Sequence, residues 1–157
     1  MPVSLYGSGQ TVIQVVQGSN STETSTTSTS FVATGLTATI TPQSTTSKIF
    51  IMFNGILVPA DGNGGALSVA IYRGSTNIFG DAVNSANGTM VGSDNPLNMS
   101  LRLSMNYLDF PATTSSTTYT LYLAASSGLG FSGGTTAYLN KGSANTSTLT
   151  LFEISGS

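Results

Sequence analysis

Two carboxylates are the first candidates for chemistry in this chain. Asp109 closes the apolar alternation that runs through Leu108, and Glu153 lies in the last apolar run. A pair of carboxylates is the usual catalytic equipment of glycoside hydrolases. Nothing in the sequence places these two together, and each is expected at a strand edge, as a solvated charge or in a salt bridge with a lysine or arginine. A polysaccharide depolymerase is therefore the least favoured of the functions considered.

The sequence lacks most of the residue types that other catalytic and metal-binding sites use. The chain contains no histidine and no cysteine, which removes the usual general base, the usual zinc ligands, thiol nucleophiles and disulfides. Serines are abundant, but none lies in a Gly-x-Ser-x-Gly elbow. The stretch Asp61 to Gly65 (DGNGG) resembles an oxygen-rich calcium loop, yet no acidic residue follows at a suitable spacing, and a glycine turn is favoured. We predict no catalytic residue, no metal site and no cofactor.

The charge balance limits the partners. Four Lys and Arg residues against six Asp and Glu residues cannot form the basic stripe that nucleic-acid binding needs. The longest apolar run, Ile49 to Val58, is interrupted at Asn54-Gly55 and is about half the length of a membrane helix. Met1 to Gly7 has neither a basic nor a long apolar stretch, so no secretory signal is predicted. We expect a soluble protein made in a cytoplasm, without a nucleic-acid or membrane partner.

Two-residue alternation of apolar and polar side chains dominates the chain and predicts half-buried β-strands. It is strictest over Met99 to Tyr107. The inward residues of the other alternating strands are predicted to be Leu36, Ala38, Ile40, Leu67, Val69, Ile71, Tyr119, Leu121, Leu123, Ala125, Leu149 and Leu151. Val12 to Gln17 and Ile49 to Val58 are more continuously apolar, and these two segments are predicted to be central strands covered on both faces.

Glycine-, proline- and asparagine-marked turns separate these runs at short intervals. The segment Thr41 to Phe50 echoes Phe110 to Tyr119: each has a proline, a Ser/Thr loop and then an apolar strand. Two such corners predict that the chain crosses twice between two sheets. The fold class is therefore all-β, a two-sheet antiparallel β-sandwich of jelly-roll or Greek-key type. Residues 11–157 are predicted to form this single domain, and residues 1–10 an extended N-terminal arm.

Four apolar residues among small and glycine-rich neighbours are the candidate contact residues. Leu5 and Tyr6 would anchor the N-terminal arm on a neighbouring subunit or on a shell beneath, and the alternative is a frayed terminus. Leu129 and Phe131 belong to the glycine loop Ser126 to Gly134. They are either tucked into the core, the favoured interpretation, or kept for contact.

Six segments share their order along the chain and their loop sequences with one known group of proteins. They are Val12–Gln17, Ser25–Pro42, Ser44–Lys48, Tyr72–Thr76, Leu108–Tyr119 and Thr148–Ile154. Together they cover most of the chain, and they resemble a Ser/Thr-rich domain of virion proteins from tailed phages, especially phages of cyanobacteria and other aquatic bacteria. Such domains occur at the ends of fibre proteins and as small head proteins. The resemblance implies a β-sandwich, usually a trimer, and carries no catalytic residues.

Two departures from that group bear on function. Phe110 occupies a position where the group has small polar residues, and the chain has no shaft or virion-attachment module, which a tail fibre would need. We therefore expect a capsid decoration (cement) protein, a homotrimer bound to the major capsid protein on the outer head surface of the virion. The alternative is a tail-fibre or receptor-binding tip that recognises host surface glycans through Ser, Asn and Tyr on its loops.

Overall fold

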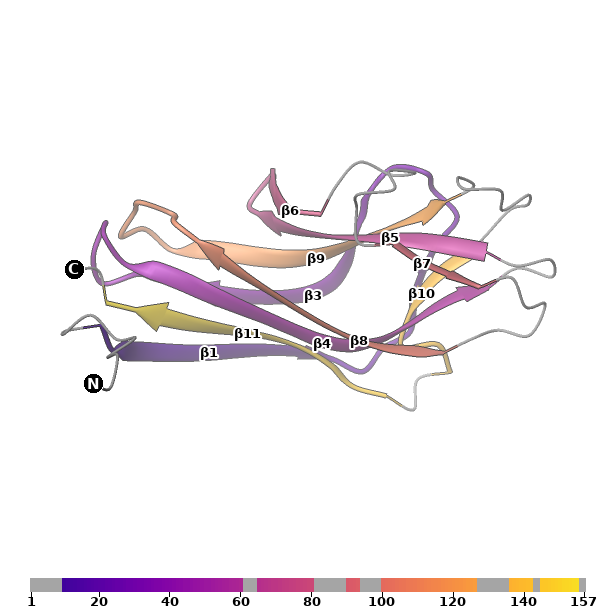
Figure 1. The fold of residues 1–157 in the computed structure, drawn as a ribbon, viewed down its shortest axis with the longest axis horizontal. Coiled ribbons are helices and arrows are strands. Elements are labelled where there is room, and N and C mark those ends of the chain that lie inside the picture. The colour runs from indigo at the N-terminus through magenta and orange to yellow at the C-terminus, as the bar shows by residue number, and fades with distance from the viewer. Residues whose placement is uncertain are drawn as a thin grey trace, which may run out of the picture.

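The computed structural model describes residues 10–60, 65–80, 90–93, 100–126, 136–142 and 145–155. Throughout these residues the regular structure is β-strand, arranged as two antiparallel sheets that face each other as layers (Figure 1). No helix in this part of the chain is long and apolar enough to cross a membrane. The prediction of an all-β, two-sheet antiparallel sandwich is confirmed. Most of the predicted N-terminal arm lies outside the described residues, and the division at residue 10 stays a prediction.

The first sheet is organised around one long central strand, β4. Along one edge β4 pairs with β8, and along the other it pairs with β11 and then with β10. β1 pairs with β11 and β2 pairs with β10, so both lie at the margin of the sheet. The strands of the first sheet are β1 (Val12–Asn20), β2 (Thr24–Thr26), β4 (Lys48–Ala60), β8 (Leu101–Asp109), β10 (Thr136–Leu139) and β11 (Ser147–Ile154).

The second sheet has the order β3-β9-β5-β6, with β7 also paired to β5. Its strands are β3 (Val32–Ile40), β5 (Gly65–Arg73), β6 (Thr76–Phe79), β7 (Met90–Ser93) and β9 (Thr117–Ser126).

The pairings of the two sheets are nested along the chain. β5 pairs with β6 and β7, β4 with β8, β3 with β9, and β1 with β11, so that each pair encloses the one before it. Successive pairs alternate between the two sheets. Nested antiparallel pairs distributed in this way over two sheets define a jelly roll, one of the two topologies predicted from the sequence.

The core lies between the two sheets and is built from the alternating residues. The inward residues predicted for β3, β5, β9 and β11 are buried: Leu36, Ala38, Ile40, Leu67, Val69, Ile71, Tyr119, Leu121, Leu123, Ala125, Leu149 and Leu151. In β8, where the alternation is strictest, Met105 is buried, whereas Leu101, Leu103 and Tyr107 are only partly buried. From β4, Ile49, Ile51 and Phe53 fill the middle of the cluster. The branched and aromatic side chains suit the pleated inner faces of such sheets.

The two Ser/Thr corners do what the sequence predicts. Residues 41–47 lead from β3 in the second sheet to β4 in the first, and residues 110–116 lead from β8 back to β9. Because β3 pairs with β9 and β4 with β8, the corners lie side by side at one end of the sandwich (Figure 1). Hydroxyls satisfy the backbone there: Thr46 N–H donates to Ser44 Oγ at 3.2 Å and Ser115 N–H to Thr113 Oγ1 at 3.0 Å.

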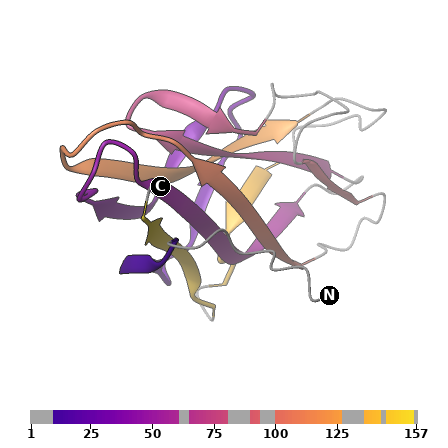
Figure 2. The ribbon, with the colours of Figure 1, turned by 60° about the vertical axis from the view of Figure 1, so that its left-hand side comes forward.

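One strand prediction is wrong. Val12 to Gln17 was predicted to be central and covered on both faces, but β1 lies at the margin of the first sheet (Figure 2). Val12 and Val15 are each 55% exposed. The other continuous run, in β4, is central as predicted, although Phe50, Met52 and Ile56 on its outer face stay partly exposed. The continuous apolar pattern reflects an apolar outer surface, not a second buried face.

β1 approaches the second sheet closely at Gly18. A Cβ atom added to this glycine would lie 1.7 Å from the carbonyl oxygen of Thr37 and 3.4 Å from Cα of Ala38, both in β3. A backbone oxygen cannot move aside as the end of a flexible side chain can. Only glycine therefore allows the margins of the two sheets to meet here.

We expect Gly18→Ala to destabilise the fold by about 3 kcal/mol, because the added methyl group must push β1 and β3 apart. Chemical denaturation followed by circular dichroism measures this change. Ser19→Ala, at the neighbouring exposed position, is the matched control and should stay within about 0.5 kcal/mol of the unsubstituted protein. Equal midpoints for the two variants would contradict the close approach of the strands.

Candidate functional site

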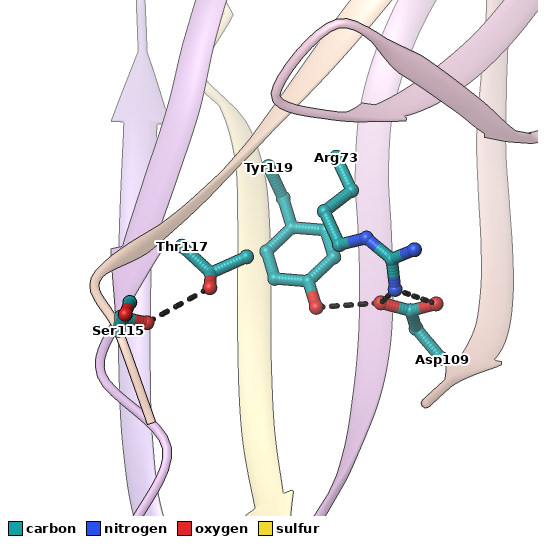
Figure 3. A network of polar contacts seen from close by, with 5 residues as sticks. All are labelled: Arg73, Asp109, Ser115, Thr117 and Tyr119. Carbon is teal, nitrogen blue, oxygen red and sulfur yellow. Dashed lines mark hydrogen bonds and ion pairs between the residues drawn. The ribbon is translucent and has the colours of Figure 1, made fainter. Parts of the chain in front are cut away.

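The end of the sandwich that carries the corners also carries a partly buried ionic contact. Arg73 Nη1 lies 2.9 Å from Oδ1 and 2.8 Å from Oδ2 of Asp109, and the Tyr119 hydroxyl donates to Oδ2 at 2.7 Å (Figure 3). Asp109 comes from β8 of the first sheet, whereas Arg73 and Tyr119 are cross-strand partners on β5 and β9 of the second. The contact therefore ties the two sheets together.

The environment of this contact leaves no free catalytic group. Tyr119 is fully buried. Burial, the larger cause, and the hydrogen bond to Asp109, the second, raise the pKa of the Tyr119 hydroxyl well above its usual range. Asp109 is 5% exposed and accepts bonds on both of its oxygens. The salt bridge predicted for Asp109 is confirmed, while a solvated carboxylate is not what the structure contains. Geometry of this kind stabilises a fold and offers a substrate neither an acid nor a base.

Tyr119→Phe is expected to cost about 2 kcal/mol near pH 8, since a hydrogen bond to a charged group is lost. An ordinary tyrosine ionises near pH 10, whereas Tyr119 keeps its proton to higher pH when folded. Its stabilisation is thus complete below about pH 10 and declines as the pH rises further. The stability difference between the unsubstituted protein and the variant should shrink as the pH is raised above about 10 in urea titrations. A difference that stays constant would refute this linkage, and Tyr122→Phe is the control.

Glu153 departs more clearly from the sequence prediction. It is fully buried on the inner face of β11, so the prediction of a solvated or salt-bridged carboxylate is wrong. Its Oε1 accepts the backbone N–H of Gln43 at 2.7 Å, which anchors the first corner. Its Oε2 has no hydrogen-bond partner, and neither has Oε1 of Gln14, the residue directly opposite on β1. The alternation of the last strand continues through Glu153, and this pattern was the available signal that the side chain points inward.

The two carboxylates are nearer to each other than the sequence suggested. Glu153 and Asp109 are the register partners of Ile49 on its two sides, so the three occupy one row of the inner face. Two strand spacings put their backbones roughly 10 Å apart. Both are buried beneath the corners, and no cluster of three or more Asp, Glu, His or Cys suited to a metal ion occurs within the described residues. This row closes the core at the corner end of the sandwich, and its role is structural.

Glu153→Gln should leave the free energy of unfolding at neutral pH equal or slightly higher. The amide keeps an acceptor for Gln43 and gains a donor for the unpaired oxygen of Gln14, and it removes a buried charge. Glu153→Ala, which removes the acceptor and leaves a cavity, should cost about 2 kcal/mol. Thermal and urea unfolding of the two variants test this. A large loss for the glutamine variant would show that the charge itself is needed.

The most unusual surface of the described residues is the outer face of the first sheet near the corners. One complete row across β1, β11, β4 and β8 is apolar, Val15-Phe152-Phe50-Leu108, and the ring centroids of Phe50 and Phe152 lie 6.1 Å apart. Apolar residues of the neighbouring rows extend it. We call this surface the apolar half-face. Its members are Val12, Ile13, Val15, Phe50, Met52, Leu108, Phe110, Phe152 and Ile154, together with the aliphatic part of Lys48.

The same face becomes polar toward its other end. Gln17 Nε2 donates to Thr150 Oγ1 at 2.9 Å, and Ser104 donates to Asn54. Arg102 lies beyond them, opposite Ile56. A single sheet face is thus divided along its strands into an apolar half and a hydrogen-bonded half. Contiguous exposed apolar surface of this kind marks contact sites in soluble proteins.

The candidate contact residues named from the sequence, Leu5, Tyr6, Leu129 and Phe131, all fall outside the described residues. So do residues 61–64 of the glycine turn, while Gly65 begins β5. The apolar half-face was not recognised from the sequence, because its residues in Val12 to Gln17 and Ile49 to Val58 were assigned to strands covered on both faces. Phe110 was the one available signal: it breaks the small, polar pattern of the corner and is 61% exposed.

No protein-family model matches the chain, and no curated protein matches it. Among solved structures, the VP2 protein of infectious bursal disease virus in a subviral particle is similar, with 16% identity and a TM-score of 0.40 over 91% of this chain and 40% of VP2. A point mutant of VP2 in derived T=1 particles gives 21% identity and a TM-score of 0.36 over 89% of this chain and 36% of its own. The chain spans less than half of either protein. At these scores the likeness carries no inference about function.

Proposed function

We propose that this chain is a structural subunit of a phage particle, a capsid decoration protein that assembles as a homotrimer on the outer head surface. The observation that carries the proposal is a jelly-roll domain with an exposed apolar half-face, beside which the described residues place no catalytic group. A surface of this type serves binding to protein. The sequence resemblance to Ser/Thr-rich phage virion domains supplies the class of particle.

The chemistry of the exterior supports a role in assembly. The chain has only ten charged residues. Asp109 and Glu153 are buried, and the partly exposed Arg73 is paired with Asp109. On the described strands, the outward positions other than Lys48 and Arg102 are occupied by hydroxyl, amide and apolar side chains. Each trimer would bridge neighbouring copies of the major capsid protein through uncharged contacts and so resist internal pressure.

Binding to the shell should therefore depend weakly on salt. Raising NaCl from about 0.05 M to about 0.5 M shortens the Debye length to a few ångströms but leaves apolar and hydrogen-bonded contacts in place. Decorated particles washed over this range and re-purified by sedimentation should retain this protein, as quantified on gels. Release at moderate salt would argue against the proposed chemistry of the contact.

Copy number and position separate decoration from the alternative function at a fibre tip. Cryo-electron microscopy of virions that contain this chain should show it on the head, in hundreds of copies. A few to a few dozen copies at the tail would instead assign it to a fibre or receptor-binding tip, and binding to host surface glycans would then be the next property to measure.

A further inference from the structure

We infer that the apolar half-face is the surface through which one copy of this chain contacts the next in the trimer, with the β1 flank of one copy against the Phe110 corner of its neighbour. The inference rests on the homotrimer of the proposed function and adds the surface and the residues that form it. It places the apolar half-faces toward the symmetry axis and the second sheets on the outside.

Exposure is greatest on the two lateral flanks of the half-face. On the β1 flank, Val12, Ile13 and Val15 are 55%, 39% and 55% exposed. On the opposite flank, where β8 passes into the corner, Phe110 is 61% exposed. Between the flanks, Phe50 and Phe152 cover each other and are only partly exposed. Two different apolar flanks on one face fit a head-to-tail contact, which closes into a ring when the rotation allows.

The size of the surface fits a second copy of the chain. The four flank residues leave on the order of 350 Å² in contact with water, given the area of a full apolar side chain. The partly exposed members bring the half-face to about 500 Å², near the upper range for a monomer. With its polar border this approaches the roughly 800 Å² that each partner contributes to a stable association.

The charge distribution is compatible with identical partners. Lys48 is the one charged member of the half-face, and its Nζ lies 5.7 Å from the centroid of the Phe110 ring. Arg102 lies on the polar half of the same face. Copies can therefore meet without burying an unpaired carboxylate, and the lysine of each copy keeps an aromatic partner at the contact.

Phe110→Glu tests the contact through the oligomeric state. Light scattering coupled to gel filtration should show a trimer for the unsubstituted protein. The variant should show monomers, with at least about a tenfold rise in the concentration of half-dissociation, as expected for the loss of a central aromatic contact. Ser104→Glu, which adds the same charge on the polar half, should remain trimeric. Unfolding midpoints verify that both variants fold.

Crosslinking tests which flanks meet, because the chain has no cysteine of its own. Val15→Cys and Asn106→Cys proteins are mixed under conditions of subunit exchange and treated with a short bis-maleimide; Asn106 is exposed on the outer face of β8, on the Phe110 flank, so this variant keeps the Phe110 ring. Crosslinks between the two variants, and few within either variant alone, are expected. Crosslinks of Val15→Cys with itself would overturn the head-to-tail arrangement in favour of a two-fold contact.

The remaining outcomes separate this inference from the proposed function. A Phe110→Glu protein that stays trimeric overturns the inference, whether or not it still binds shells. If that trimer no longer binds shells, the half-face belongs to the capsid contact instead. A monomeric unsubstituted protein overturns the inference and the trimer together, while its position on virions decides the decoration function independently.

Discussion

The register of β4 with β8 and β11 determines which side chains of the first sheet point into the core and which point outward. Because β8 and β11 both pair with β4 over nearly its full first half, each row of side chains crosses three strands and points wholly inward or wholly outward. One row, Glu153-Ile49-Asp109, closes the core at the corner end. The next row, Phe152-Phe50-Leu108, lies outside. If β8 and β11 each slipped by one residue, Phe152 and Leu108 would point inward and both carboxylates would face water. The polar end of the core and the apolar outer surface therefore depend on the same strand register.

Polar groups in the core are tolerated at this end because the opposite sheet and the first corner supply partners for them. Asp109 receives hydrogen bonds from a guanidinium and a phenol of the opposite sheet, and Glu153 receives a backbone N–H from the first corner. A buried carboxylate without such donors would be costly. The same bonds hold the corners to the sheets, which keeps Phe110 and the β1 flank in a defined relation on the surface. The hydrogen bonds of the buried carboxylates thus help to position the exposed residues at this end of the sandwich.

Much of the fold could be predicted from the sequence because alternation reports burial directly. The inward residues of β3, β5, β9 and β11 were predicted from period alone, and the repeated proline corners predicted the two crossings between sheets. The position of a strand within its sheet was not predictable in this way. Val12 to Gln17 borders the exposed apolar half-face, and an apolar run has the same appearance whether it lies in the protein core or on an apolar surface. The partnership of Arg73, Asp109 and Tyr119 was equally hidden, since pairing across sheets depends on register and not on spacing along the chain.

The division of the outer face into an apolar and a polar half has a geometric consequence for any assembly built on it. Subunits that are attracted along only half of a flat face converge at that half and diverge at the other. An assembly closed through the apolar half-face would therefore taper, with its narrow end at the corners and a hydrated mouth toward Arg102.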